Sequence, residues 1–219
     1  MSLHDLDRRA LDLDHRALLL ARTRAHHPFA ERAAGAYSRL GEHAACWMAL
    51  GGVGAWLEDD PARRRAWLRG VRVVVGAYGL NLAIKLAVRR PRPQLAGLEP
   101  LTPTVSRLSF PSAHATTSFA AARAYRGLAP AAALYCAAGA FALSRPYLGV
   151  HYPSDVLAGA LIGTILAGAW PSSRHPAGPS ESWRACTHPA GPSESWRSCT
   201  HPAGPSESCP SPRPAGAPR

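Results

Sequence analysis

Cysteine is scarce in this chain of 219 residues, and the placement of the few present argues against a zinc site and a disulfide framework. Three of the five cysteines, Cys186, Cys199 and Cys209, lie in a polar tail, and the other two stand alone in apolar segments. No pair has the close spacing of a zinc site, and no disulfide framework is indicated. Histidines recur with the tail cysteines, which leaves a metal site there as an alternative to simple duplication of one peptide. We expect duplication, no metal ion and no cofactor.

Acidic side chains are also few, so the formal net charge is +11 and the pI is about 10.3. A strongly basic chain raises the question of nucleic-acid binding, but the basic residues form no long run and no nucleic-acid motif is present. Their tight clusters, at residues 63–65 and 89–92, flank apolar segments, where basic side chains commonly anchor membrane helices. The charge pattern therefore favours a membrane protein and predicts no nucleic-acid partner.

A secretory signal peptide is excluded because Asp5, Asp7, Asp12 and Asp14 interrupt the start of the chain. Leucines among these charges have a loosely helical spacing, so residues 1–40 are predicted to form an amphipathic helical region. Such a helix could lie on a lipid surface or pack across the ends of a helix bundle. We favour the packed arrangement.

No very long apolar run occurs; five shorter ones follow one another instead. They cover residues 44–57, 66–88, 115–125, 128–143 and 156–170. A straight crossing needs about 20 residues, so the first run must be extended from about Tyr37, and a soluble helical bundle remains the alternative. Abundant alanine and glycine permit close helix approach in lipid. We predict an all-α, membrane-embedded bundle of about five transmembrane helices, with a domain at residues 41–170.

Residues 171–219 differ in character from the rest of the chain. A nine-residue peptide that begins at His175 recurs from His188 and in part from His201, with a period of 13 residues, and eleven of the 21 prolines lie here. Short units rich in Pro, Ser and Gly cannot bury a core. This tail is predicted to be disordered.

The most informative stretch is residues 144–155, which holds Arg145, His151 and Asp155 among two prolines and a glycine. Proline and glycine at this density predict a turn between two helices, with Asp155 at the N-cap of the second. An imidazole becomes a nucleophile or base when a carboxylate holds its other ring nitrogen, and a guanidinium suits phosphate oxygens. The alternative is that Asp155 only caps a helix and His151 is a surface residue.

Two earlier stretches strengthen the functional interpretation. Lys85 and Arg92 end one apolar run, and Ser112 and His114 open another. The three stretches read Lys-x6-Arg-Pro, Pro-Ser-x-His and Ser-Arg-x5-His-x3-Asp, which closely resemble, in order and spacing, the motifs of the type 2 phosphatidic acid phosphatase superfamily. The resemblance covers roughly residues 40–170. It departs from the family at Ala113, where glycine is usual, and we expect the extra methyl group to be tolerated unless that backbone needs a positive φ.

This resemblance implies metal-independent phosphoryl transfer through a covalent phosphohistidine. His151 would attack phosphorus, Asp155 would orient its ring, and His114 would serve as general acid and then base. The phosphate oxygens would be held by Lys85, Arg92, Ser112, Arg145 and the backbone N–H groups beside Ala113. With five crossings, all three motifs emerge on one membrane face. Arg89, Arg90 and Arg107 have no motif position and are interpreted as interface anchors.

The expected substrate is a membrane lipid that carries a terminal phosphate. Residues 108–120 resemble the actinobacterial branch that dephosphorylates decaprenyl-phosphoryl-ribose 5-phosphate in cell-wall synthesis, and we expect an integral protein of a bacterial plasma membrane. Undecaprenyl diphosphate, phosphatidic acid and phosphatidylglycerol phosphate are alternative substrates. Two other classes stay open: a vanadium-dependent haloperoxidase and a non-catalytic membrane binding protein. The sequence does not indicate the membrane face or the oligomeric state.

Overall fold

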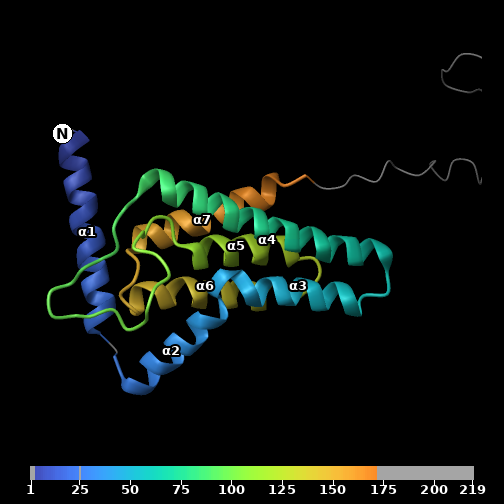
Figure 1. The fold of residues 1–219 in the computed structure, drawn as a ribbon, viewed down its shortest axis with the longest axis horizontal. Helices are drawn as coiled ribbons and strands as arrows, with labels where there is room; N and C mark the ends of the chain where they lie inside the picture. The colour runs from blue at the N-terminus through green and yellow to red at the C-terminus, as the bar shows by residue number, and fades with distance from the viewer. Residues whose placement is uncertain (1–2, 25, 172–219) are drawn as a thin grey trace, which may run out of the picture. The chain divides into compact units, whose positions relative to one another are not determined.

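Helices make up most of the structure, a computed structural model that describes residues 3–24 and 26–171 (Figure 1). In chain order they are α1 (Leu3–Thr23), α2 (Pro28–Leu40), the 3₁₀ helix η1 (Glu42–Ala44), α3 (Ala45–Leu57), α4 (Pro61–Val88), α5 (Ala113–Tyr125), α6 (Ala131–Tyr147) and α7 (Pro153–Ala169). Within the described residues there is no strand, only isolated bridges between Pro91 and Leu108 and between Leu95 and Leu98. The prediction of an all-α fold is confirmed. The predicted disorder of the repeat tail falls outside the described residues.

The longest helix, α4, begins and ends where the residue chemistry requires. The Asp60 carboxylate accepts hydrogen bonds from the N–H groups of Ala62 and Arg63, at 3.0 and 3.2 Å, and Pro61 occupies the first turn. The helix ends at Arg89, whose φ of 53° lies in the left-handed region. Its 28 residues exceed the ~20 that cross a bilayer. Among the described helices, α4 is long and apolar enough to span a membrane, and α7 is a shorter apolar helix.

The expected extension of the first apolar run from Tyr37 is wrong in its geometry. Helix α2 ends at Leu40, and α3 begins only at Ala45 and is 13 residues long. Between them, His43 and Ala44 have φ values of 53° and 58°, which an uninterrupted α-helix cannot contain. The chain therefore changes direction at residues 41–44, and this bend becomes part of the site described below.

The turn between the last two helices is shorter than predicted. Helix α6 continues to Tyr147, so Arg145 and Pro146 lie in its last turn and not in the connecting loop. Helix α7 begins at Pro153, and Tyr152 is its N-cap. Asp155 is thus the third helical residue, and its side chain accepts a hydrogen bond from the Tyr152 N–H at 2.9 Å. The prediction of Asp155 as the N-cap was wrong by three positions, because Pro153 fits the first turn of a helix.

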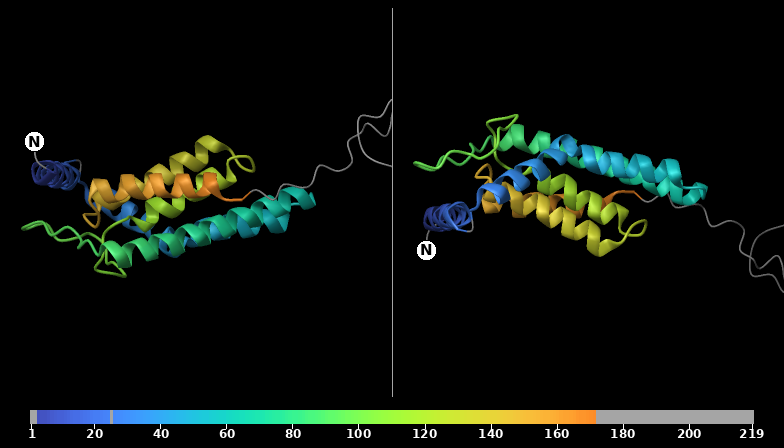
Figure 2. Two further views of the ribbon diagram at one scale, coloured as in Figure 1. Left: turned by 90° about the horizontal axis from the view of Figure 1, so that it is seen from above. Right: turned by 90° about the horizontal axis from the view of Figure 1, so that it is seen from below.

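Helix α5 lies at the centre of the bundle and contacts α3, α4, α6 and α7 (Figures 1 and 2). Ten of its 13 residues are buried, and most are alanine, serine or threonine. Two glycines of α7 face its backbone: a Cβ atom at Gly163 would lie 2.0 Å from the Thr116 carbonyl oxygen, and one at Gly159 would lie 2.7 Å from that of Ser112. The small residues therefore bring the two helices together, as the composition predicted.

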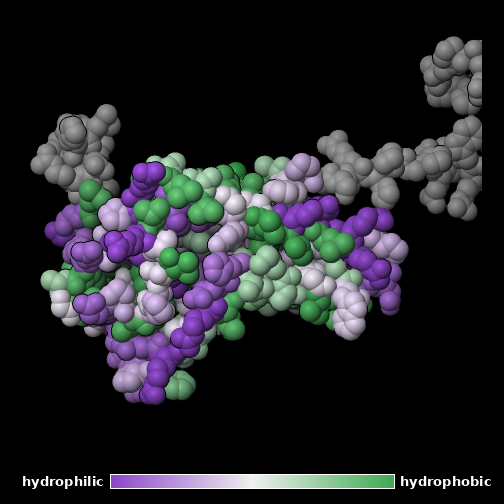
Figure 3. Space-filling view, in the orientation of Figure 1, coloured by the Kyte–Doolittle hydropathy of each residue, from purple (hydrophilic) through white to green (hydrophobic). Residues whose placement is uncertain are grey.

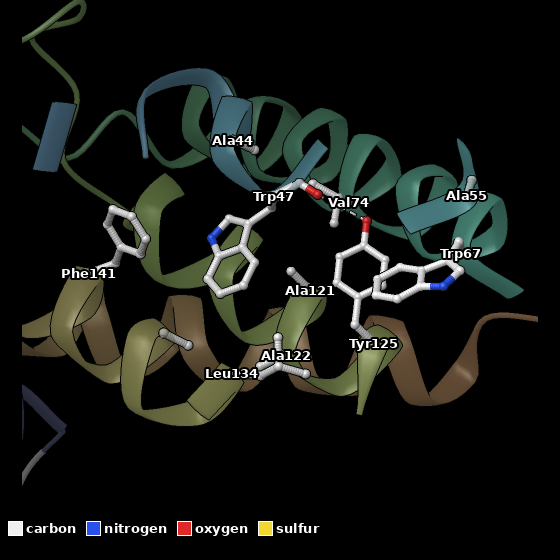
Figure 4. Close-up of a cluster of buried hydrophobic side chains, with 11 residues drawn as sticks. Ala44, Trp47, Ala55, Trp67, Val74, Ala121, Ala122, Tyr125, Leu134 and Phe141 are labelled. Atoms are coloured by element: carbon white, nitrogen blue, oxygen red, sulfur yellow. Dashed lines mark hydrogen bonds between the residues drawn. The ribbon is translucent and has the colours of Figure 1, made fainter. Parts of the chain in front are cut away.

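Aromatic side chains fill the space around the C-terminal half of α5 (Figure 4). The Tyr125 ring lies against Trp67 with ring centroids 5.3 Å apart, and its hydroxyl donates to the Trp47 carbonyl oxygen at 3.1 Å. The Trp47 indole donates to the Ser118 hydroxyl at 2.8 Å. The Tyr125 hydroxyl and the Trp47 indole N–H therefore each have a hydrogen-bond partner, so these two buried rings pack without an unpaired donor.

Large hydrophobic side chains also remain on the surface of the bundle. Figure 3 shows them over α3, α4 and α7, while hydrophilic residues gather over α1, α2 and the turn between α3 and α4. Leu157, Leu161 and Ile165, at i, i+4 and i+8 of α7, are each at least 59% exposed. A water-exposed stripe of this kind is costly, whereas lipid would cover it. The surface favours a membrane-embedded bundle over the soluble alternative.

Candidate active site

The three motifs meet at one end of the bundle. Lys85 lies in the last turn of α4, Ser112 to His114 open α5, Arg145 lies in the last turn of α6, and His151 and Asp155 flank the start of α7. The loop at residues 89–112 carries Arg92 across the same end. Residues far apart in sequence thus converge because α4 and α6 end, and α5 and α7 begin, on one side (Figure 1).

Six of the eight predicted site residues line one cavity of about 200 Å³. They are Lys85, Arg92, Ala113, His114, Arg145 and His151. Ser112 and Asp155 do not line it; both are fully buried behind it. Further lining residues come from η1, from α4 and from the loop, with Tyr78, Leu82, Leu86 and Val105 among them. The lining of the cavity therefore contains both cationic and apolar side chains.

His151 is 2% exposed, and its two ring nitrogens have different surroundings. Nδ1 lies 3.5 Å from Asp155 Oδ2 and 3.4 Å from the Ser109 hydroxyl oxygen, while Nε2 lies 3.1 Å from Arg92 Nη1. A guanidinium only donates, so Nε2 is the acceptor in that hydrogen bond and the proton belongs on Nδ1. This tautomer directs the Nε2 lone pair of His151 toward Arg92, which lines the cavity.

The electrostatics of the site keep the His151 ring uncharged. Burial, with Arg92 and Arg145 nearby, lowers its pKa to about 3, against the opposing effect of Asp155. Burial also lowers the pKa of Arg92 to about 10, which still leaves that guanidinium charged at neutral pH. A neutral imidazole beside fixed cations suits nucleophilic attack on an anionic group.

The cationic side chains are held by main-chain oxygens. Lys85 Nζ donates to the carbonyl oxygens of Leu108 and Ser109 at 3.1 and 3.3 Å. Arg92 donates to those of Ser106 and Val150 at 2.7 and 2.6 Å. These contacts fix the cations without neutralising them, because carbonyl groups carry no net charge.

Two buried polar atoms in the described part of the site lack a hydrogen-bond partner: Arg145 Nε and the Ser112 hydroxyl oxygen. Arg145 is 6% exposed and donates to the Ser38 hydroxyl through Nη1. The Ser112 N–H is already taken by the Asp155 carbonyl oxygen, at 3.0 Å. An unsatisfied buried donor costs about 1–3 kcal/mol, and an anion in the cavity would repay that cost at Arg145.

His114 and Ala113 occupy the first turn of α5. His114 Nε2 lies 2.8 Å from the Ser38 carbonyl oxygen, so the proton belongs on Nε2 and Nδ1 is the basic nitrogen. The backbone φ of Ala113 is not positive, in agreement with the condition set for tolerance of its methyl group. Ser38 thus contacts both His114 and Arg145, a link from α2 that no motif predicted.

Ser109, Arg90 and Asp14 are further polar residues at the site that sequence reasoning missed. The Ser109 hydroxyl donates a short hydrogen bond to Asp155 Oδ2. Arg90 forms ion pairs of 2.8 Å with both Asp155 and Asp14, so its interpretation as an interface anchor was wrong. None of the three lies at a position of the three motifs. The arginine pair at residues 89–90 was a hint of a functional cation, but the sequence does not indicate which of the two side chains points into the site.

Comparison with known proteins decides the family. The model of the PAP2 superfamily matches residues 67–178, about half of the chain. The chain belongs to the PAP2 superfamily. The decaprenylphosphoryl-5-phosphoribose phosphatase of Mycolicibacterium smegmatis is 46% identical over 126 residues, which are 57% of this chain and 68% of that one. The protein of the same name from Mycobacterium tuberculosis is 40% identical over 126 residues, 58% of this chain and 70% of that one.

Two solved structures share the fold. The crystal structure of Aquifex aeolicus LpxE has a TM-score of 0.55 and 24% identity, over 71% of this chain and 92% of that one. The transmembrane PAP2-type phosphatidylglycerolphosphate phosphatase of Bacillus subtilis has a TM-score of 0.59 and 23% identity, over 73% and 83%. The predicted family is therefore confirmed. This PAP2 protein is a lipid phosphatase and a membrane protein, and the haloperoxidase and binding-protein alternatives find no support among these relatives.

Proposed function

We propose that this PAP2 phosphatase removes the terminal phosphate of a polyprenyl-linked ribose 5-phosphate in a bacterial plasma membrane, through a phosphohistidine at His151. The observation that carries the proposal is the cavity where His151 Nε2 meets the side chains of Lys85, Arg92 and Arg145. Three cations match a phosphate monoester, whose oxygens gain charge in the transition state.

The first half of the reaction follows from the tautomers. A phosphate oxygen takes over the Arg92 Nη1–H, which frees the Nε2 lone pair of His151 to attack phosphorus, so an N–P bond forms as the ester P–O bond breaks. The positive charge that develops on the ring is stabilised by Asp155, whose Oδ2 lies 3.5 Å from Nδ1. His114 Nδ1 takes up a proton from the phosphate monoester as that monoanion binds and gives it to the leaving oxygen, while the Nε2–H remains bound to Ser38.

In the second half His114 takes a proton from a water molecule, and that water attacks phosphorus. The N–P bond breaks and inorganic phosphate leaves, which restores neutral His151. The cations Lys85, Arg92 and Arg145 hold the same oxygens in both halves, together with the N–H groups at the start of α5. Ser112 acts from behind the cavity, as the N-cap of that helix. The cycle uses no metal ion or cofactor.

The substrate class is supported by the mixed cationic and apolar lining of the cavity and by the relatives. A lipid phosphate needs cations for its head and apolar contacts for the chain that follows, and Tyr78, Leu82 and Leu86 supply the latter on α4. Relatives with 40–46% identity are named as decaprenylphosphoryl-5-phosphoribose phosphatases. Undecaprenyl diphosphate, phosphatidic acid and phosphatidylglycerol phosphate are the alternative substrates that the experiment must separate.

The proposed membrane arrangement uses α3 to α7 as five spans. The exposed leucines and isoleucine of α7 favour lipid contact, although α3 and α5 have only 13 residues each. Short spans can be accommodated by local thinning of the bilayer. We retain residues 41–170 as the membrane phosphatase domain, residues 1–40 as a helical N-terminal region and residues 171–219 as a tail.

The test is phosphate release from a panel of lipid phosphates by detergent-purified protein in EDTA, beside His151→Ala. We expect release from the polyprenyl-ribose phosphate to exceed that from the three alternatives, and we expect the variant to lose at least about 10³-fold in kcat, because the nucleophile is gone. A phosphorylated intermediate should be trapped by a quench in alkaline detergent, since the N–P bond of phosphohistidine is labile in acid, and in the natural protein only.

Each outcome has a distinct meaning. Preference for phosphatidic acid would overturn the substrate but leave the phosphatase. Activity that needs a divalent cation would overturn the metal-independent mechanism. Release that survives in His151→Ala would show that the cavity is not the catalytic site. Vanadate should inhibit release, and halide oxidation on its addition would restore the haloperoxidase alternative.

A further inference from the structure

The two carboxylate oxygens of Asp155 have separate sets of partners. Oδ2 accepts from the Ser109 hydroxyl and from the Tyr152 N–H, and faces His151 Nδ1. Oδ1 accepts from Arg90 Nη1 at 2.8 Å. Asp155 is 0% exposed, so its charge depends on these partners alone for stabilisation. Arg90 therefore holds the carboxylate oxygen of Asp155 that faces away from His151.

Arg90 is in turn fixed on three sides. Its Nη2 donates to Asp14 Oδ2 at 2.8 Å, and its Nη1 also donates to the Ser154 hydroxyl at 2.7 Å. The guanidinium lies over the Tyr152 ring, 4.1 Å from the centroid. Burial opposes its charge, but Asp14 and Asp155 more than offset burial and raise the pKa of Arg90. Arg90 is thus a permanent cation that two carboxylates share.

Asp14 reaches this cluster from α1, 141 positions before Asp155 in the sequence. Its Oδ1 accepts from the Ser154 N–H at 2.9 Å and its Oδ2 from the Ser154 hydroxyl. Ser154 is the second residue of α7, whose N–H has no partner within its own helix. A buried carboxylate here stabilises both the start of α7 and Arg90. Asp14 is 8% exposed, so it is no ordinary surface charge of an amphipathic helix.

A second contact holds α1 in place. Arg22, 6% exposed, donates to the carbonyl oxygens of Glu99 and Tyr147, at 2.8 and 3.4 Å. Helix α1 also contacts α6 and α7. The described part of α1 is therefore attached at two points to the turn that carries His151, which favours the packed arrangement over a helix lying free on lipid.

We propose that Asp14 and Arg90 are positioning residues for the nucleophile, so that α1 is a working part of the active site. Asp14 orients Arg90, Arg90 orients the Asp155 carboxylate, and Asp155 orients the His151 ring. The inference rests on the proposed role of His151. Neither Asp14 nor Arg90 lines the cavity, so their loss should lower kcat and leave phosphate binding unchanged.

The experiment uses the full-length protein in detergent with Asp14→Asn, Arg90→Gln and the double variant. Two matched controls are available: Asp12→Asn, on the same helix, where Asp12 pairs with exposed Arg16 at 2.9 Å, and Arg89→Gln, next to Arg90 and exposed. Loss of an outer partner of a metal-ligating histidine costs about 10- to 100-fold, and we take the same range for a histidine nucleophile. We expect such a fall in kcat for both test variants, with KM and inhibition by inorganic phosphate within about twofold, and controls within about twofold.

The double variant decides whether the residues act in series. If Asp14 works through Arg90, the double variant loses no more than Arg90→Gln alone. Independent losses that multiply, or a fall in melting temperature with kcat unchanged, would overturn the proposal. Arg90→Lys, which keeps the charge but not the fork, should recover part of the kcat if Arg90→Gln folds poorly.

A spectroscopic readout separates this inference from the proposed function. In protein labelled with ¹⁵N-histidine, the His151 signal, assigned by its loss in His151→Asn, should report Nδ1–H in the natural protein. In Asp14→Asn and Arg90→Gln it should shift or broaden, because the carboxylate is no longer held. Unchanged spectra would overturn the positioning role even in a protein that proved inactive on every lipid tested, whereas inactivity with the expected shifts would count against the proposed substrate alone.

Discussion

The two ends of α5 are held by opposite means. At its N-terminal end, buried polar groups meet across long separations: His114 with Ser38, the Ser112 N–H with the Asp155 carbonyl oxygen, and Lys85 with the loop before the helix. At its C-terminal end, the Tyr125 ring fits against two glycines. A Cβ atom at Gly51 would lie 2.2 Å from the Tyr125 hydroxyl oxygen, and one at Gly70 would lie 2.1 Å from Cε1.

If the proposed mechanism holds, this difference separates the groups that serve catalysis from those that serve stability along one helix. Polar contacts are directional, so a small change at the N-terminal end alters the orientation of reacting groups more than the fold. Ring-to-glycine contacts depend on volume, so a change at the C-terminal end alters packing. The comparison predicts that the two ends respond to substitution in different measurements.

The largest effect is expected at the polar end, from Asp155→Asn. The amide cannot stabilise the charge that develops on His151, and it also leaves Arg90 with one carboxylate fewer. We expect a fall in kcat on the order of 10²- to 10³-fold, with phosphate affinity little changed, since Asp155 does not line the cavity. Steady-state kinetics with inhibition by inorganic phosphate measures both. A near-normal kcat would show that the polar contacts of Asp155 do not control the reaction.

A smaller effect is expected at the packed end, from Gly70→Ala. The added methyl group would meet the Tyr125 ring, so we expect a loss of about 1–3 kcal/mol in the free energy of unfolding, with kcat per folded molecule unchanged. Gly79→Ala is the matched control on α4, because no atom lies within 4 Å of its Cβ position. Equal stability of the two variants in detergent unfolding would show that the ring is not tightly packed.

The effect that is smallest at neutral pH is a pH dependence of the free energy of unfolding, which reports the protonation of His151, the proposed nucleophile at the polar end. The pKa of His151 is about 3 in the folded protein, below the value of about 6.5 for an unperturbed histidine. The unfolded chain therefore binds the proton first, and stability falls as the pH falls from about 6.5 toward 3. His151→Asn should remove up to about 1.4 kcal/mol per pH unit of this slope. Identical slopes in unfolding titrations of the two proteins would contradict a buried neutral ring.

Local spacing was enough to predict that most of the candidate site residues lie close together. The run from Arg145 to Asp155 holds its functional groups within one turn and two helix ends, so their proximity depends on few backbone angles. The three motifs meet because the helices that carry them are antiparallel neighbours, which the count of apolar runs indicated. The errors were of boundary: Arg145 lies inside α6 and Asp155 three residues into α7.

The supporting residues were out of reach for a physical reason. Asp14 and Ser38 approach the site from α1 and α2, and their partners lie 76 to 140 residues away. Nothing in the sequence distinguishes a buried aspartate of an amphipathic helix from an exposed one. From the sequence alone, Asp14 was used only to exclude a signal peptide. The bend at His43 and Ala44 was also hidden, since alanine does not favour a left-handed backbone and a single histidine does not predict one.

Lys85 is the only lysine in the chain, and it is 7% exposed at the edge of the cavity. Apart from the α-amino group, the protein therefore offers amine-directed chemistry a single target, and that target is in the proposed phosphate site. An amine-reactive probe becomes a reporter of site occupancy, since a bound anion would shield Nζ. Because no other lysine lies on the described bundle, a modified lysine side chain would be identified as Lys85 without further mapping.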